Sequence, residues 1–217
     1  HSFPTRRSSD LLAGAHAAHT EEAALAAQAG DRIEAATAQA NLGNVAAAAQ
    51  RWDDALRHYD AAVPQLRELG SIGLLLPVLA NRAQIHHLQQ RLPQAVADYA
   101  DAAEVAARAG NLAAAKQWAD PGVQLAYQVQ DFARAERLWA VLGDLARASG
   151  DQAGLQRALG ERALLLINRS NSGADQSLLA QAAALLTEQE AVCRATSDWR
   201  GLAQCVGNRA IVQRYTG

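Results

Sequence analysis

Apolar residues recur along the chain at intervals of three and four, which is the spacing of one face of an α-helix. In the first complete copy of this pattern, two such runs cover residues 31–49 and 53–69. A short polar turn, Gln50-Arg51, separates the two runs before Trp52. The sequence therefore predicts a helical hairpin, in which two helices are joined by a tight turn.

The hairpin pattern returns every forty residues. A glycine closes each copy, at Gly30, Gly70, Gly110 and Gly150, and glycine can adopt the left-handed conformation that ends a helix. The same register position holds alanine, at Ala15, Ala55, Ala95 and Ala135. Three residues earlier stand Leu12, Trp52, Leu92 and Phe132, and four residues later stand His19, Tyr59, Tyr99 and Trp139. Alanine lets two helix axes approach closely, so this period predicts a stack of similar units rather than one globular core.

The period assigns residues 12–217 to successive units. They are a half repeat at 12–30, full repeats at 31–70, 71–110 and 111–150, a repeat at 151–197 with an insertion at 171–177, and a truncated repeat at 198–217. The last unit is recognised because Gly201-Leu202 echoes Gly154-Leu155. Asp53, Pro93 and Asp131 fall where an N-cap or first-turn residue is expected.

Three segments resemble a known family: Ala40-Asn41-Leu42-Gly43-Asn44, Arg51-Trp52-Asp53-Asp54-Ala55-Leu56, and Tyr59 with Ala62. They resemble the tetratricopeptide repeat (TPR) in its longer-helix form of about forty residues. This form is similar to the repeats of kinesin light chains and of the sensor halves of bacterial signal-transduction ATPases. From Leu12 to the end, the resemblance implies an all-α fold, an α-α superhelix (TPR-like solenoid) of antiparallel helical hairpins. The family hosts many unrelated binding roles, so the resemblance alone does not fix the function.

Residues 1–11 do not follow the repeat, and they read as the translation of a common short-read sequencing adapter. A targeting peptide is the rival interpretation, but no apolar stretch of signal-peptide length follows. We therefore expect an artefactual or disordered leader and leave it out of the fold prediction. The chain contains no methionine, and we expect it to be a fragment of a larger bacterial protein.

Composition narrows the possible partners. Half of the residues are apolar and many of these are alanine, which favours helices throughout. Lys116 is the single lysine beside nineteen arginines, a bias that suggests G+C-rich coding and a bacterial source. A net charge of −2 with acids and bases interspersed offers no basic stripe for nucleic acid. No uncharged run is long enough to cross a bilayer, so we expect no membrane segment in this region.

The chain offers only weak candidates for metal binding or catalysis. His16, His19 and Glu22 share one helix face, but no second ligand cluster accompanies them, and His19 occupies the ring position of the repeat. Cys193 and Cys205 are interpreted as reduced core thiols in a cytoplasmic protein, close together in the last hairpin. No nucleophile with its base, no dinucleotide fingerprint and no phosphate loop is present. The sequence therefore predicts no metal, no cofactor and no enzyme activity.

In the family that the chain resembles, the first helices of the hairpins line the concave face that holds extended peptides or partner helices. Carried over by register, the predicted peptide-binding residues are Asn41, Asn44, Asn81, Gln84, His87, Gln124, Tyr127 and Gln128. Side-chain amides donate and accept hydrogen bonds, which suits them to a peptide backbone. The alternative is that Asn41, Asn81 and Asn208, which are equivalent by register, bridge neighbouring helices.

Two function hypotheses follow. The first is a protein-protein interaction scaffold that binds a peptide or partner helix on its concave face. The alternative is a regulatory array that senses an effector and restrains an attached signal-transduction ATPase or transcriptional regulator. One local expectation also concerns the fold: Asp120-Pro121-Gly122 should kink or restart the first helix of its unit, because proline lacks the backbone N–H and clashes with the preceding turn.

Overall fold

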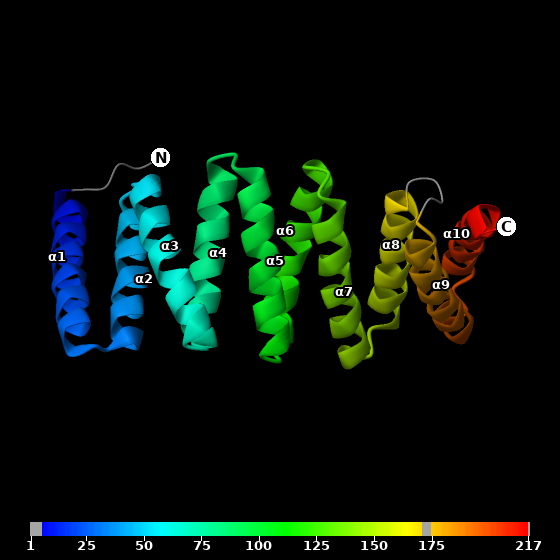
Figure 1. Ribbon diagram of the computed structural model, residues 1–217, viewed down its shortest axis with the longest axis horizontal. Coiled ribbons are helices and arrows are strands. Elements are labelled where there is room, and N and C mark those ends of the chain that lie inside the picture. Colours follow the sequence, from blue (N-terminus) through cyan, green and yellow to red (C-terminus); the bar gives the residue numbers. More distant parts are fainter. Residues whose placement is uncertain (1–5, 171–174, 217) are drawn as a thin grey trace. The chain divides into compact units, whose positions relative to one another are not determined.

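The computed structural model describes residues 6–170 and 175–216, and every regular element in these ranges is an α-helix (Figure 1). The helices are α1 (Arg6–Ala29), α2 (Arg32–Ala48), α3 (Trp52–Glu68), α4 (Ile72–Leu88), α5 (Leu92–Arg108), α6 (Leu112–Gln128), α7 (Phe132–Ser149), α8 (Gln152–Arg169), α9 (Gln176–Thr196) and α10 (Trp199–Thr216). The predicted runs 31–49 and 53–69 thus correspond to α2 and α3, which confirms the all-α class.

The chain divides into two compact units, His1–Val105 and Ala106–Gly217. In unit 1, the successive helices from α1 to α4 pack against one another, α1 on α2, α2 on α3 and α3 on α4 (Figure 1). In unit 2, α6 to α10 do the same. In addition, α2 contacts α4 and α8 contacts α10. The first helix of one hairpin therefore packs on the first helix of the following hairpin, as stacked hairpins require.

The alanine register is buried between helices. Ala55, Ala95 and Ala135 are completely buried, and the rings four residues later, on Tyr59, Tyr99 and Trp139, are at most 6% exposed. A methyl group at these positions leaves room for the neighbouring helix, and the ring fills the space between hairpins. The repeat register predicted from the sequence is thus the packing register of the structure.

The turns are of two kinds. Gly30, Gly70, Gly110 and Gly150 have φ between 66° and 74°, which confirms the predicted left-handed caps between hairpins. The turns within hairpins place Gln50, Gln90 and Gln130 in the same conformation, with φ of 58° to 59°. A residue with a Cβ is strained there by about 1–2 kcal/mol. The polar character of Gln50-Arg51 predicted a turn but not this strained conformation.

Side-chain caps begin several of the helices. Asp31, Asn111, Asp131 and Asp151 each accept a hydrogen bond from the backbone N–H three residues later, at 2.9–3.1 Å. Asp198 makes the same bond to Gly201 at the start of α10. These caps satisfy donors that no helical carbonyl can reach. They also confirm the helix start that was predicted at Asp131.

The structure corrects one expectation and qualifies two. Of the kink or restart predicted at Asp120-Pro121-Gly122, the restart is wrong, because α6 continues through Pro121, and the kink stays a prediction. Gly122, Val123 and the following turn are buried, so packing holds the segment helical. In the insertion, α9 already begins at Gln176 with Asp175 as its cap, while 171–174 lie outside the described residues. Residues 1–5 of the predicted leader also lie outside them, and α1 begins at Arg6.

Unit 1 contains a buried ion pair. Arg82 on α4 donates two hydrogen bonds to the Asp98 carboxylate on α5, at 2.8 Å from Nε and 2.5 Å from Nη2. A third bond of 2.8 Å joins Arg82 to Asp60 on α3. The Asp98 side chain is only 6% exposed. This cluster connects three consecutive helices through charge-assisted hydrogen bonds.

We expect acid to destabilise unit 1 through His86, which lies 3.9 Å from Asp98. Burial is the main cause that lowers the pKa of His86, Asp98 opposes it and Arg82 adds to it. The folded state therefore holds the ring neutral, whereas the unfolded chain binds a proton near pH 6.5. Stability should rise with pH through this range and fall as the pH drops below about 6.5.

Urea unfolding at pH 7.5 and pH 5 tests the role of His86. The His86→Gln variant should lose less stability between the two pH values than the wild-type chain. The same substitution at the neighbouring exposed His87 should leave the acid-induced loss in place. An equal loss in wild type and His86→Gln would contradict the assignment.

Candidate functional site

A polar link ties successive first helices together in unit 1. The Tyr59 hydroxyl on α3 donates to Asn44 Oδ1 on α2 at 2.7 Å. Asn81 Nδ2 on α4 donates to the same oxygen at 3.0 Å. One amide oxygen therefore connects three helices. Asn81 bridges neighbouring helices, as the alternative interpretation of the asparagines predicted, while Asn208 Nδ2 is buried without a hydrogen-bond partner.

Unit 2 repeats this link with different residues. Trp139 Nε1 on α7 donates to the Tyr127 hydroxyl on α6 at 3.2 Å, and this hydroxyl donates to Glu161 Oε2 on α8 at 2.9 Å. Burial and the neighbouring carboxylate raise the pKa of Tyr127 to about 12. Trp139 and Glu161 lie two periods after Tyr59 and Asn81. In each unit, therefore, an aromatic side chain of a second helix takes part in hydrogen bonds that connect the first helices on either side of it. We call this arrangement the internal lock.

The register, the alanine contacts and this repeated lock together decide the type of fold. The chain consists of helical hairpins packed in sequence order, and their register resembles that of the tetratricopeptide repeat. No protein-family model and no curated protein sequence matches it.

Three crystal structures resemble the chain in fold. BtubC (BKLC) from P. vanneervenii is 17% identical, with 95% of this chain and 92% of that chain covered and a TM-score of 0.44. Aspartyl phosphate phosphatase F from Bacillus subtilis is 13% identical, with 85% of this chain and 50% of the phosphatase covered and a TM-score of 0.44. A tetratricopeptide repeat protein from Parabacteroides merdae is 15% identical, with 89% and 99% covered and a TM-score of 0.25.

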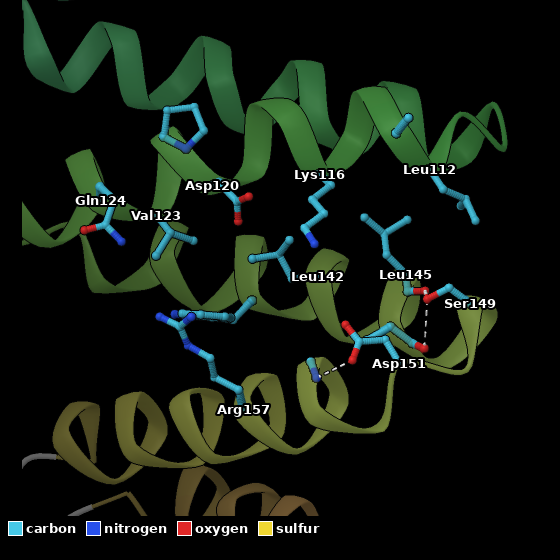
Figure 2. Close-up of a pocket in the computed structure, with 15 residues that line it drawn as sticks. Leu112, Lys116, Asp120, Val123, Gln124, Leu142, Leu145, Ser149, Asp151 and Arg157 are labelled. Carbon is cyan, nitrogen blue, oxygen red and sulfur yellow. Dashed lines mark hydrogen bonds between the residues drawn. The ribbon is translucent and has the colours of Figure 1, made fainter.

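A groove of unit 2 lies between α6 and α8 with α7 as its floor (Figure 2). Its volume is about 810 Å³. The lining residues are Leu112, Ala113, Lys116, Asp120, Pro121, Val123, Gln124, Trp139, Leu142, Leu145, Ala146, Ser149, Asp151, Gly154 and Arg157. The α7 floor is largely apolar, and the polar side chains Lys116, Asp120, Gln124 and Arg157 stand along the two rims.

The α6 rim carries Lys116, Asp120 and Gln124, which follow one another at intervals of four residues and so share one helix face. Figure 2 shows Lys116 and Asp120 extending from α6 toward Leu142, while Arg157 extends toward them from α8. Among the described residues, none of these four has a hydrogen-bond or ion-pair partner. Their donors and acceptors are therefore available to a ligand.

Arg157 is held by stacking. Its guanidinium carbon lies 5.1 Å from the centroid of the Trp139 ring, which is the distance of a cation–π contact. At the opposite end of the groove, Asp151 uses one carboxylate oxygen to cap Gly154 N at 2.9 Å. Asp151 thus has a structural task at the start of α8, whereas Arg157 presents its N–H edges to the groove.

A smaller groove of about 410 Å³ lies in unit 1. It brings together three of the predicted residues, Asn44, Asn81 and Gln84, with Trp52 and Tyr59 among its walls. Of the other predicted residues, Gln124 lines the unit 2 groove and Tyr127 belongs to the internal lock. The remaining three line neither groove: Asn41 is half-buried, and His87 and Gln128 are exposed on α4 and α6.

Sequence reasoning missed Lys116, Asp120, Leu142 and the special position of Arg157. Two signals could have found them. Lys116 is the single lysine of the chain, and Asp120 places a carboxylate at the register position of Ala40 and Ala80, which are both buried. A charge that replaces alanine in a repeat indicates that the position faces open space.

The remaining candidates have structural explanations. His19 Nδ1 lies 2.7 Å from Glu22 Oε2, and the described residues contain no group of three or more potential metal ligands. Cys193 and Cys205 are free and buried, Cys205 Sγ donates to the Leu186 carbonyl, and burial raises the pKa of both thiols. No helix in the described part of the chain is long and apolar enough to cross a membrane.

Proposed function

We propose that this chain is a protein-interaction scaffold that binds a peptide or a partner helix in the unit 2 groove. The observation that carries the proposal is the groove itself, with an apolar floor and four side chains on its rims that have no partner among the described residues. Apolar side chains of a ligand would gain burial on the floor. The rim groups would then fix its orientation through hydrogen bonds.

In unit 1, we propose that Asn44, Asn81 and Gln84 contact the backbone of an extended segment. Asn44 Oδ1 accepts from Tyr59 and Asn81, which fixes the Asn44 amide, while Asn44 Nδ2 has no acceptor among the described residues. Gln84 is exposed beside them. This arrangement supports backbone recognition without a requirement for side-chain charge. His87, Gln124, Tyr127, Gln128 and Asn41 complete the proposed peptide-binding set.

Blocking the unit 2 groove tests the proposed function. Ala113 is exposed and lines the groove, and Ala153 is exposed at the equivalent register position of the next hairpin but lies outside it. Peptides are first selected on the wild-type chain from a random displayed library. Ala113→Trp should then weaken their binding at least about tenfold, or about 1.4 kcal/mol, because the indole occupies the groove.

Fluorescence anisotropy of labelled synthetic peptides measures these affinities. Ala153→Trp is the matched control and should bind like the wild-type chain, since it adds the same side chain outside the groove. Equal affinities for both variants would show that the peptides bind elsewhere and would refute the proposal.

The size of the same groove favours a second candidate function. A volume of about 810 Å³ falls in the usual range of small-molecule sites, roughly 300–1,000 Å³. The array would then sense an effector and pass the signal to an attached signal-transduction ATPase or transcriptional regulator. A thermal-shift screen of metabolites tests this function. A metabolite that raises the unfolding temperature of the wild-type chain and of Ala153→Trp, but not of Ala113→Trp, would support it.

A further inference from the structure

The charges at the unit 2 groove are local and nearly balanced. Lys116 lies one helical turn before Asp120 on α6, and Glu161 lies one turn after Arg157 on α8. Opposite charges at this spacing offset one another at longer range. The groove therefore has no strong overall attraction for an acidic or a basic ligand. Recognition must depend on individual groups at short distance.

Arg157 differs from the arginines around it. Arg134, Arg147, Arg162, Arg194 and Arg209 each bond a carboxylate of their own unit. Arg157 instead lies over Trp139, and the indole cannot turn freely because its Nε1 is bonded to Tyr127, which is bonded to Glu161. The contact with the indole holds the guanidinium at the groove, and its N–H donors have no acceptor among the described residues, so they are available to a carboxylate.

Asp120 offers the opposite charge on the other rim. It precedes Pro121, whose ring restricts the backbone, and α6 is helical on both sides of it. Between the two rims, Leu142 lies half-buried on α7 beside the buried Leu145. An acid-binding group, an apolar floor and a base-binding group thus succeed one another across the groove.

We propose that the partner segment presents an acidic residue to Arg157, an apolar residue to Leu142 and Leu145, and a basic residue to Asp120. This inference rests on the proposed peptide-binding function and names the chemistry of its ligand. The apolar residue contributes burial, while the flanking charges select the sequence and its direction. A peptide with only acidic or only basic residues fits one rim and leaves the other without a partner.

Charge reversal tests the inference. The library of random peptides displayed on phage is selected separately on the wild-type chain, Arg157→Glu and Asp120→Lys. Wild-type peptides should share an apolar position flanked by Asp or Glu on one side and Lys or Arg on the other. Arg157→Glu should replace the acid with a base, and Asp120→Lys should replace the base with an acid. Arg200→Glu on α10 makes the same charge change outside the groove and should select the wild-type pattern.

Affinities of synthetic peptides complete the test. For a wild-type consensus peptide, Arg157→Gln should weaken binding roughly tenfold, and replacing the acidic residue of the peptide by its amide should do the same. The two changes together should cost little more than either alone. If Ala113→Trp weakens binding of the selected peptides but these peptides share no charge pattern, this inference is overturned and the scaffold function stays in place. If Ala113→Trp leaves their binding unchanged, both the charge pattern and the proposed scaffold function of this groove are overturned.

Discussion

Replacing Asp98 by alanine is expected to lower the free energy of unfolding of unit 1 by about 3–5 kcal/mol. The carboxylate accepts two hydrogen bonds from Arg82, and its side chain is 6% exposed. Its removal leaves a guanidinium that is 16% exposed with Asp60 as its remaining partner. The large effect arises because a buried charge without its full set of partners is far costlier than a lost contact.

Urea unfolding with hydrogen-exchange mass spectrometry of α3 to α5 measures this loss within unit 1. Glu68→Ala removes the partner of Arg32 in a pair that is more than half exposed, and it should cost less than about 1 kcal/mol. The double variant Arg82→Met, Asp98→Leu should recover most of the stability, because no buried charge remains. A loss in Asp98→Ala as small as that in Glu68→Ala would show that the pair is dispensable.

The second large effect is expected at Gly43. A Cβ at this position would clash with Cε1 of Tyr59, and the Tyr59 ring is completely buried and bonded to Asn44 through its hydroxyl. Overpacking of this kind costs about 1–3 kcal/mol and exceeds the gain of about 0.5–1 kcal/mol that alanine brings to a helix. We therefore expect Gly43→Ala to lower the stability of unit 1 by a net of about 1 kcal/mol.

Gly207 provides the matched control in α10, since a Cβ there would meet no atom within 4 Å. Gly207→Ala should raise the stability of unit 2 by about 0.5–1 kcal/mol, through helix propensity alone. Thermal unfolding followed by circular dichroism, together with exchange rates in α2 and α3, distinguishes the two outcomes. A stabilised Gly43→Ala variant would mean that Tyr59 can shift, contrary to its fully packed and hydrogen-bonded position.

The sequence was most informative about features that recur. Ala55, Ala95 and Ala135 are completely buried at the same register position of successive hairpins, so their common residue type reports a common packing requirement. The closing glycines were predictable for the same reason, because each turn needs the left-handed backbone. Repetition effectively replaces an alignment of related proteins, and the fold could be inferred from one chain.

The unit 2 groove could not be predicted in this way because it is built from residues that do not recur. Lys116 aligns with Leu76 and Gln156, and Arg157 aligns with Pro77 and Gln117. A periodic pattern carries no information about residues that do not recur. The stacking of Arg157 on Trp139 also depends on side-chain directions across two helices, which spacing along one helix does not determine. The restart expected at Pro121 failed for a related reason, because tertiary packing outweighed a local preference.

The forty-residue period has an evolutionary consequence. One period contains a complete hairpin, its turn, its closing glycine and its half of each interface with adjacent hairpins. Recombination that adds or removes a whole period at a glycine boundary therefore joins compatible surfaces, whereas a change of another length within a helix misaligns the alanine contacts. Genes of this type can change length in steps of one hairpin, and each added hairpin supplies fresh groove positions on which selection can act without disturbing the others.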